Sequence, residues 1–315
     1  MKYLDPKADL TFKKVFGEHP DLVISLLNAL LPFNTPEEEI TGVEYLPAEL
    51  VPENPLRKNS ILDVRCRDAR GRQFIVEMQM IWSPEFEQRV LFNAAKAYVR
   101  QLDGGEDYLL LEPVYSLNLV NEIYEPGMPE YYHYYRLVHV EHTDKVINGL
   151  HLVFVELPKF TPRTYSEKKM QILWLRYLTE IDEKTREVPA ELLANPEIRK
   201  AVIQIEESAF TEEQLYGYEK FWDTISVEKT LFNSAKRRGF AEGFTDGKAA
   251  GLEEGKAAGL EEGKAVGLEE GRAEGRAEGE VIGLMRTALR LKEEGYSTSF
   301  ITQITGLTPE QIRQL

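Results

Sequence analysis

Residues 61–80 combine an alternating hydrophobic pattern with two acidic residues that could share a metal ion. Apolar residues alternate with polar ones on both sides of a polar turn, which predicts two antiparallel strands joined as a hairpin. Aligning the apolar positions pairs Val64 with Val76, and the same register places Asp63 directly opposite Glu77. Directly opposed side chains have Cβ atoms only about 4.5–5.5 Å apart. Two carboxylates at that separation repel each other, so their placement calls for a physical reason.

A shared divalent cation is one such reason, because carboxylate oxygens are the hard ligands that Mg²⁺ and Ca²⁺ prefer. One alternative is a solvated polar face in which Asp63 and Glu77 point into water. A second is a strand register that differs by two residues and separates them. The pattern by itself leaves these alternatives open.

The elements around the hairpin predict an α/β fold. The order helix, strand, hairpin, helix and strand is typical of a sheet with helices packed on it. From about Phe160 the chain becomes mainly helical. We therefore expect a sheet-containing domain at 1–160 and a helical extension at 161–235 that packs on it. The expected helices lie at 6–16, 22–31, 85–102, 166–178, 196–207 and 211–232, and the further strands at 41–50, 114–120, 131–140 and 150–157.

Residues 236–283 carry a repeat in which glycine occupies every fourth position from Gly239 to Gly283. Alanine and the alternating charges favour a helix, whereas each glycine costs about 1 kcal/mol relative to alanine. Two interpretations follow: a flexible spacer, or a long helix whose glycines allow a second helix to approach closely. We favour the helix, self-associating into a homo-oligomer. The segment 284–315 is expected to form short helices that resemble a helix-turn-helix, and with few basic residues it is better suited to a protein partner than to DNA.

Composition excludes several classes of protein. The net charge of −15 argues against a general polyanion binder. No apolar run approaches the ~18–20 residues that a membrane span requires, and no glycine-rich loop follows a strand as nucleotide binding would need. The single cysteine, Cys66, falls on the expected buried face of a strand, which excludes a disulfide framework and predicts a cytoplasmic location.

Three motifs in order carry a family resemblance: DLTFKKVFG near the N-terminus, ILDVRCRDARGRQFIVEMQM in the hairpin, and VELPKF further along. Together they resemble the PD-(D/E)xK nuclease superfamily, and more narrowly the Rpn family of recombination-promoting nucleases and transposases. The resemblance covers about residues 3–180. It implies a restriction-endonuclease-like core, which is a mixed sheet flanked by helices. The helical C-terminal region with its long glycine-repeat helix is similar to that family as well.

The resemblance also implies a Mg²⁺-dependent DNA endonuclease with little sequence preference and a role in recombination or transposition. Asp63 and Glu77 would hold the metal with help from the Met78 backbone carbonyl, and Mn²⁺ or Ca²⁺ could substitute in binding. Gln79 would orient the attacking water at a position where the superfamily usually has lysine. A glutamine can hydrogen-bond water but brings no positive charge. This departure, and Leu62 in place of the motif's proline, leave a second hypothesis open: a catalytically weak nuclease fold that acts as an oligomeric interaction module.

Further residues could assist the site or contact DNA. Asp9 and Lys13 lie on the first predicted helix, where relatives place an auxiliary acid, although an i,i+4 surface ion pair is the favoured interpretation. Arg89, on the helix after the hairpin, could contact phosphate or simply face solvent. The same two alternatives apply to the arginines around the hairpin turn, which are Arg65, Arg67, Arg70 and Arg72.

Overall fold

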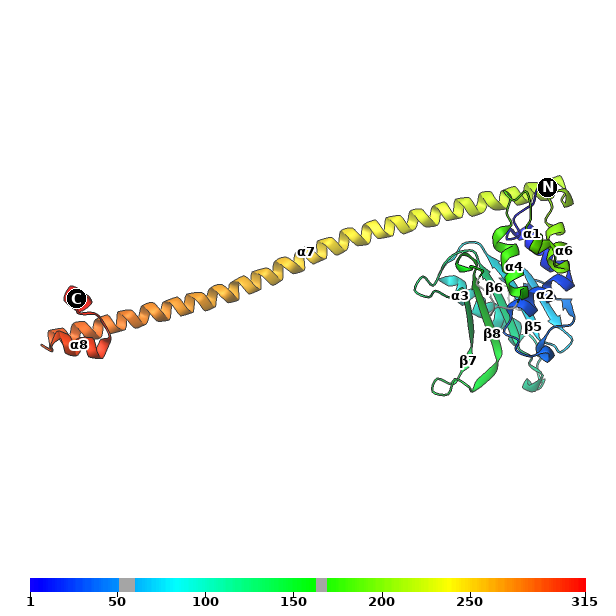
Figure 1. Ribbon diagram of the computed structural model, residues 1–315. Helices are drawn as coiled ribbons and strands as arrows, with labels where there is room; N and C mark the ends of the chain where they lie inside the picture. The colour runs from blue at the N-terminus through cyan, green and yellow to red at the C-terminus, as the bar shows by residue number, and fades with distance from the viewer. Residues whose placement is uncertain (51–59, 163–168) are drawn as a thin grey trace. The chain divides into compact units, whose positions relative to one another are not determined.

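The computed structural model describes residues 1–50, 60–162 and 169–315. The chain divides into two compact units, Met1–Phe232 and Asn233–Leu315, which are considered separately below. Figure 1 colours the chain from the N-terminus in blue to the C-terminus in red. Among the described helices, none has the length and apolar character that crossing a membrane demands.

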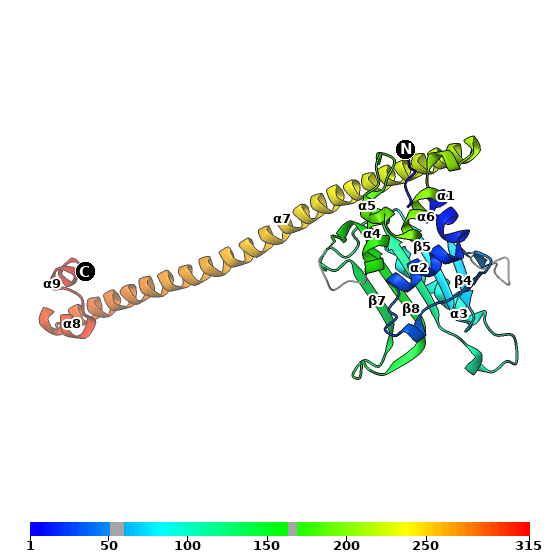
Figure 2. The same cartoon turned by 45° about the vertical axis from the view of Figure 1, so that its right-hand side comes forward.

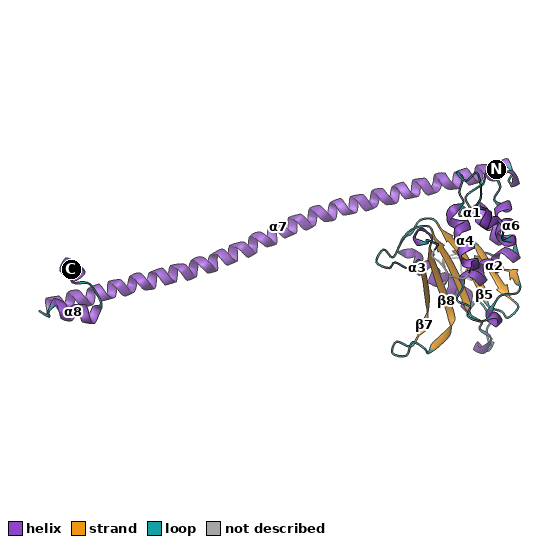
Figure 3. Cartoon of the chain, in the orientation of Figure 1, coloured by secondary structure: helices purple, strands orange, loops and turns teal. Residues whose placement is uncertain are grey.

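A mixed six-stranded sheet forms the centre of the first unit, with strand order β1-β4-β5-β6-β8-β7. The β1–β4, β4–β5 and β7–β8 pairs are antiparallel, whereas β5–β6 and β6–β8 are parallel. This confirms the predicted mixed sheet flanked by helices, as Figure 3 shows in orange and purple. The strands are β1 (Val43–Tyr45), β4 (Val64–Asp68), β5 (Gln73–Gln79), β6 (Val114–Val120), β7 (Tyr132–Val138) and β8 (Val146–Glu156).

The predicted hairpin is β4–β5, and its register is confirmed: Val64 pairs with Val76 and Cys66 with Phe74. At the turn, Gly71 has a φ of +87°, a left-handed conformation that favours glycine. The expected single strand at 41–50 is wrong, because the chain leaves the sheet after β1 and forms a separate two-stranded sheet from β2 (Glu49–Leu50) and β3 (Ser60–Ile61). Pro47 lies between β1 and β2, where its missing N–H cannot continue a ladder.

Alternation along β5 decides which side chains face which helices. Phe74 and Val76 belong to the main core with the helices α2 (Pro20–Leu30), α4 (Lys169–Glu180) and α6 (Pro196–Gln204). Ile75 packs instead with α3 (Glu85–Val99) on the other face of the sheet. Figure 2 shows the helices on the two sides of the strands. Since successive side chains point to opposite faces, Glu77 and Gln79 share the α3 side with Ile75.

The N-terminal segment begins as α1 (Asp9–Phe12) and widens into the π-helical turn η1 (Lys13–Gly17). Phe16 packs against Phe12 at 4.8 Å and against Trp174 of α4 at 5.3 Å between ring centroids. These rings join residues before and after position 160 in one core. The remaining short elements of this unit are η2 (Pro36–Glu38), η3 (Tyr108–Leu110), η4 (Leu157–Lys159), α5 (Ala190–Leu193) and η5 (Glu207–Ala209).

Most predicted elements occur with shifted ends. The strand at 114–120 is reproduced as β6, whereas the helix expected at 85–102 ends at Val99 and the one at 22–31 begins at Pro20. Proline is suited to the first turn of a helix, where its missing N–H has no partner to lose. The strand predicted at 150–157 begins at Val146 as part of β8. The predicted start of a helix at Ser166 lies outside the described residues.

The glycine repeat is helical. It lies within α7 (Glu212–Glu293), which begins in the first unit and continues into the second. In the second unit, α8 (Thr298–Thr305) and α9 (Pro309–Gln314) follow α7. Ala288 of α7 packs with Ile301, Leu307 and Ile312 in a small apolar cluster.

Candidate active site

Asp63 and Glu77 lie at the open end of the β4–β5 hairpin. Asp63 occupies a bend one residue before β4, and Glu77 lies within β5. The Asp63 carboxylate reaches across to β5, where its Oδ2 accepts a hydrogen bond of 2.8 Å from the Met78 N–H. This bond fixes the Asp63 side chain beside the residue that follows Glu77.

Glu77 is a buried carboxylate, and one of its oxygens has no hydrogen-bond donor among the described residues. Glu77 is 9% exposed to solvent. Its Oε1 atom is buried and has no hydrogen-bond partner among the described residues. Burial of an ionised carboxylate without a partner is costly. A proton or a bound cation would satisfy this oxygen.

The electrostatics of the pair show the same preference. Burial raises the pKa of Glu77 above its ordinary value, and the negative charge of Asp63 raises it further. Burial also raises the pKa of Asp63, although the Met78 N–H and the charge of Lys13 oppose this. Ionising two nearby carboxylates together costs free energy. Such a pair therefore favours holding a proton until a cation replaces it.

Two cationic side chains face the pair from different helices. Lys13 Nζ lies 2.6 Å from Asp9 Oδ1 in the predicted i,i+4 ion pair. Burial lowers the pKa of Lys13, but the hydrogen bond to Asp9 and the charges of Asp9, Asp63 and Glu77 raise it overall. The N-terminal helix thus brings Asp9 and Lys13 into the electrostatic field of the acidic pair, a convergence that spacing along the sequence cannot reveal.

Arg89 of α3 supplies the second cation, next to Gln79. Its Nη2 donates a 2.5 Å hydrogen bond to Gln79 Oε1, while Gln79 Nε2 donates to the Ile81 carbonyl. The charge of Arg89 lowers the pKa of both Asp63 and Glu77. The positive charge that Gln79 lacks is therefore present beside it, on a neighbouring helix.

The arginines of the hairpin turn lie at the other end of the hairpin. Arg72 is buried and forms an ion pair with Asp68, with 2.7 Å between Nη2 and Oδ2. Arg67 pairs with Glu44 of β1, and Arg70 is exposed. The structure does not bring these three residues to Asp63 and Glu77. Because Arg72 is buried and already paired with Asp68, it has no part in the proposed function.

A buried network around Glu156 supports the loop that follows β6. Glu156 is fully buried and accepts hydrogen bonds from the Tyr124 N–H at 3.0 Å and from Lys159 Nζ at 2.6 Å. Lys159 also donates to the Glu125 carbonyl at 2.6 Å. The same loop begins with the Asn121 N–H bonded to the Gln79 carbonyl at 2.9 Å. In the sequence, only the i,i+3 spacing of Glu156 and Lys159 within VELPKF indicates this network.

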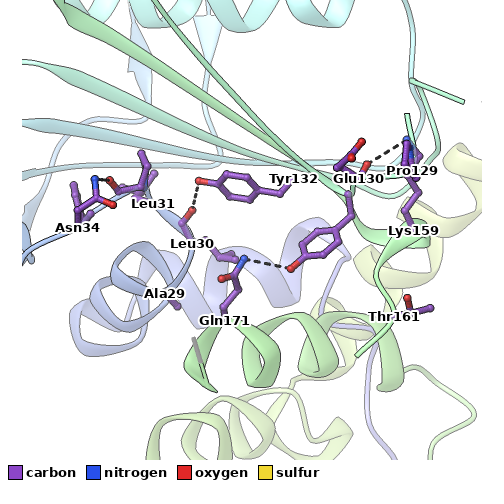
Figure 4. A pocket seen from close by; sticks show the side chains of 13 residues that line it. Ala29, Leu30, Leu31, Asn34, Pro129, Glu130, Tyr132, Lys159, Thr161 and Gln171 are labelled. Carbon is purple, nitrogen blue, oxygen red and sulfur yellow. Dashed lines mark hydrogen bonds between the residues drawn. The ribbon is translucent and has the colours of Figure 1, made fainter. Parts of the chain in front are cut away.

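A cavity of about 480 Å³ lies elsewhere, between α2, β7 and α4. At its walls the Tyr132 hydroxyl donates a hydrogen bond to the Leu30 carbonyl, as Figure 4 shows. The Gln171 amide donates to the Tyr131 hydroxyl. Neither Asp63 nor Glu77 lines it. The chemistry of the acidic pair is therefore separate from this cavity.

Comparison with known proteins agrees with the geometry. Residues 6–229 match the family described as PD-(D/E)XK nuclease family transposase. The chain belongs to this family. Membership implies a nuclease acting on DNA as a phosphodiester hydrolase in transposition. No curated protein and no solved structure matches the chain.

The residues present fit the divalent metal that such nucleases use. Glu77 Oε1 is a buried oxygen without a donor, and Asp63 offers a second carboxylate. Within the described parts of the chain, no group of three or more His, Cys, Asp and Glu side chains is arranged to hold a metal. Mg²⁺ is suited to such a sparse site, because it is commonly bound by one or two carboxylates and keeps several waters.

Proposed function

We propose that this protein is a Mg²⁺-dependent DNA endonuclease that hydrolyses phosphodiester bonds with little sequence preference and promotes recombination or transposition. The observation that carries the proposal is the convergence of Asp63 with the buried, unpartnered carboxylate of Glu77. Membership of a nuclease family of transposases supports it.

Asp63 and Glu77 would hold the metal together with the Met78 backbone carbonyl, and Mn²⁺ or Ca²⁺ would bind the same oxygens. The bound metal supplies Lewis acidity that offsets charge on the phosphate and favours ionisation of water. The chain contributes an already positioned carboxylate, since the Met78 N–H holds Asp63 in place. Because burial and mutual repulsion raise both carboxyl pKa values, binding of the metal displaces a proton.

Gln79, Arg89 and Lys13 would divide the task of the usual lysine. Gln79 orients water through its amide, which is held by Arg89 and by the Ile81 carbonyl. Arg89 and Lys13 add positive charge beside the acidic pair, where negative charge builds up on the phosphate in the transition state. Asp9 positions Lys13 through their ion pair.

Plasmid nicking with Mg²⁺ tests the proposal on the full chain. Wild type should convert supercoiled DNA to the nicked form, and Asp63→Ala and Glu77→Ala should lose this activity by about 10²–10³-fold, as expected when a preorganised transition-state contact is removed. Asp21→Ala is a matched control, because Asp21 forms an exposed ion pair with Lys200 on helices α2 and α6. Equal activity in all four proteins, or none in any of them, would refute the proposal.

We further propose that copies of this chain associate through α7. Large apolar side chains remain exposed along the glycine-rich stretch, and those of Leu252, Leu260 and Leu268 are about 60% exposed (60%, 61% and 59%). A helix that is mostly polar and carries thirteen glycines, twelve of them in the repeat, gains stability from a partner more than from its own propensity. A second copy would cover these leucines.

Light scattering tests this association. The full chain should have a mass that is a multiple of the 36.2 kDa subunit, and a chain ending at Phe232 should be monomeric. Replacing Leu252, Leu260 and Leu268 with glutamine keeps the length and lowers the mass toward that of the monomer. A full-length monomer would refute the association. An oligomer without any nicking activity would favour the interaction module instead.

A further inference from the structure

Arg65 lies on the same face of the sheet as the candidate active site. In the hairpin register it pairs with Ile75, whose side chain faces α3. Glu77 is two residues further along β5, a distance of about 6.6 Å along a strand. Arg65 Nη2 donates to Gln73 Oε1 at 2.9 Å, and Nη1 donates to the Pro47 carbonyl at 3.4 Å. These neutral partners orient the guanidinium group without neutralising it.

Arg65 belongs to a small cationic cluster with Arg100 and Lys96. Arg100 is the C-cap residue of α3, and Lys96 lies one turn earlier on the same helix. Burial lowers the pKa of Arg65, and the charges of Arg100 and Arg67 lower it further. Burial and the charge of Arg100 lower the pKa of Lys96 in the same way. The charge of Arg100 therefore repels both Arg65 and Lys96.

Among the described residues, no carboxylate forms an ion pair with Arg65 or Arg100. Arg65 Nε is also buried without a hydrogen-bond partner in that part of the chain. The neighbouring Arg67 differs, since it is paired with Glu44. The C-terminal end of α3 favours a cation at Arg100, but it provides no counter-ion for Arg65. Such a cluster is unexpected in a chain of net charge −15 unless an anion binds there.

We propose that Arg65 and Arg100 bind the phosphate backbone of DNA next to the scissile bond. The inference rests on the proposed nuclease function, because Arg65 and Glu77 share the face of the hairpin that faces α3, and this shared face identifies the anion as DNA. Contacts of arginine with phosphates fix the position of a duplex but carry no sequence information. The cluster thus accounts for binding by an acidic protein and for cleavage with little sequence preference.

Equilibrium binding without divalent metal tests this interface. Fluorescence anisotropy of the full chain with three duplexes of unrelated sequence, over a series of salt concentrations, compares wild type with Arg65→Gln and Arg100→Gln. Each substitution should lower the slope of log K against log salt by about one. If a variant and the wild type bind DNA equally at 1 M salt, a slope that is lower by one unit makes the variant bind about sevenfold more weakly at 0.15 M salt. The loss should be the same for all three duplexes.

Two further variants separate the interface from general charge and folding effects. Arg100→Lys keeps the charge and should retain the wild-type slope. Arg199→Gln removes an exposed arginine from α6 and should bind as wild type does. Thermal melting of each protein checks that it is folded. Wild-type affinity and slope in both Arg65→Gln and Arg100→Gln would overturn the inference, as would absence of DNA binding by the wild type.

The nicking assay distinguishes this inference from the proposed function. If wild type nicks DNA but the two arginine variants bind and cleave normally, the backbone interface is wrong and the nuclease function stands. If wild type binds DNA through the two arginines but never nicks it, the interface stands and the nuclease function fails.

Discussion

The two ends of the β4–β5 hairpin contain buried carboxylates in opposite electrostatic situations. At the turn, Asp68 accepts hydrogen bonds from the Arg70 and Arg72 N–H groups and from Arg72 Nε. At the open end, Glu77 has an oxygen with no partner among the described residues and a second carboxylate as its neighbour. Hydrogen bonds and an ion pair therefore satisfy Asp68 at one end of the hairpin, whereas at the other end Glu77 is influenced only by the more distant charges of Arg89 and Lys13.

This difference separates a structural charge from a functional one. Glu156 resembles Asp68, since Lys159 and the Tyr124 N–H satisfy it. A buried acid that is paired with a cation fixes local structure. Removing either partner destabilises the fold, because the other charge is left buried and unpaired. A buried acid that forms no ion pair can bind a proton or a metal reversibly. Substitutions at the two ends of the hairpin test this distinction.

Replacing Asp68 with asparagine should destabilise the fold by about 3–5 kcal/mol, because it leaves the buried Arg72 guanidinium without its carboxylate. Urea denaturation of the full chain measures the change. Glu44→Gln is the matched control, since the pair it forms with Arg67 is about half exposed (48% and 59%) and such pairs contribute less than ~1 kcal/mol. Similar small losses in both variants would contradict a structural role for Asp68.

Replacing Glu77 with glutamine should change the stability of the fold in the opposite direction to Asp68→Asn. The folded-state pKa of Glu77 is raised above its unfolded value, so its contribution to stability is greatest at low pH and is lost as pH rises through the raised pKa. At pH 8 in the presence of a chelator, the neutral amide should therefore stabilise the fold, by on the order of 2 kcal/mol. Thermal melting at several pH values measures this difference, which should vanish below the ordinary carboxyl pKa. Destabilisation at pH 8 would contradict an uncompensated Glu77.

Magnesium should raise the melting temperature of the wild type in a pH-dependent way. At a concentration tenfold above Kd, binding stabilises a protein by about 1.4 kcal/mol. The metal needs the ionised carboxylates, so the stabilisation should grow as pH rises from the ordinary carboxyl pKa through the raised pKa of Glu77. Melting curves with and without Mg²⁺ provide the test, with Glu77→Gln as the control that shows no shift. A wild type that fails to respond at any pH would favour the interaction module.

Replacing Lys13 with methionine should change stability by less than ~0.5 kcal/mol, because its i,i+4 pair with Asp9 is about half exposed (41% and 48%). It should nevertheless move the midpoint of the Mg²⁺ response to higher pH, since the charge of Lys13 lowers the pKa of both Asp63 and Glu77. Lys200→Met removes the same charge from an exposed pair with Asp21 on other helices. An unchanged midpoint in Lys13→Met would remove Lys13 from the site.

Much of the architecture could be predicted because it depends on local periodicity. The alternation around Val64 and Val76 sets the hairpin register, since a slip of one residue would turn every apolar side chain out of the core. The two-strand division of residues 41–50 could not be predicted, because Glu49 and Leu50 pair with a segment ten residues away instead of with the hairpin. Strand propensity marks extended chain but does not select its partner.

Side-chain alternation over a few residues is enough to predict the hairpin, its register and the two acids near its open end. Which cations lie near those two acids depends on tertiary packing. Packing of α3 placed Arg89 against Gln79, and the N-terminal helix brought the charge of Lys13 to the acidic pair. Charge interactions depend on distance and burial, and both arise from the folding of segments that lie far apart in the chain.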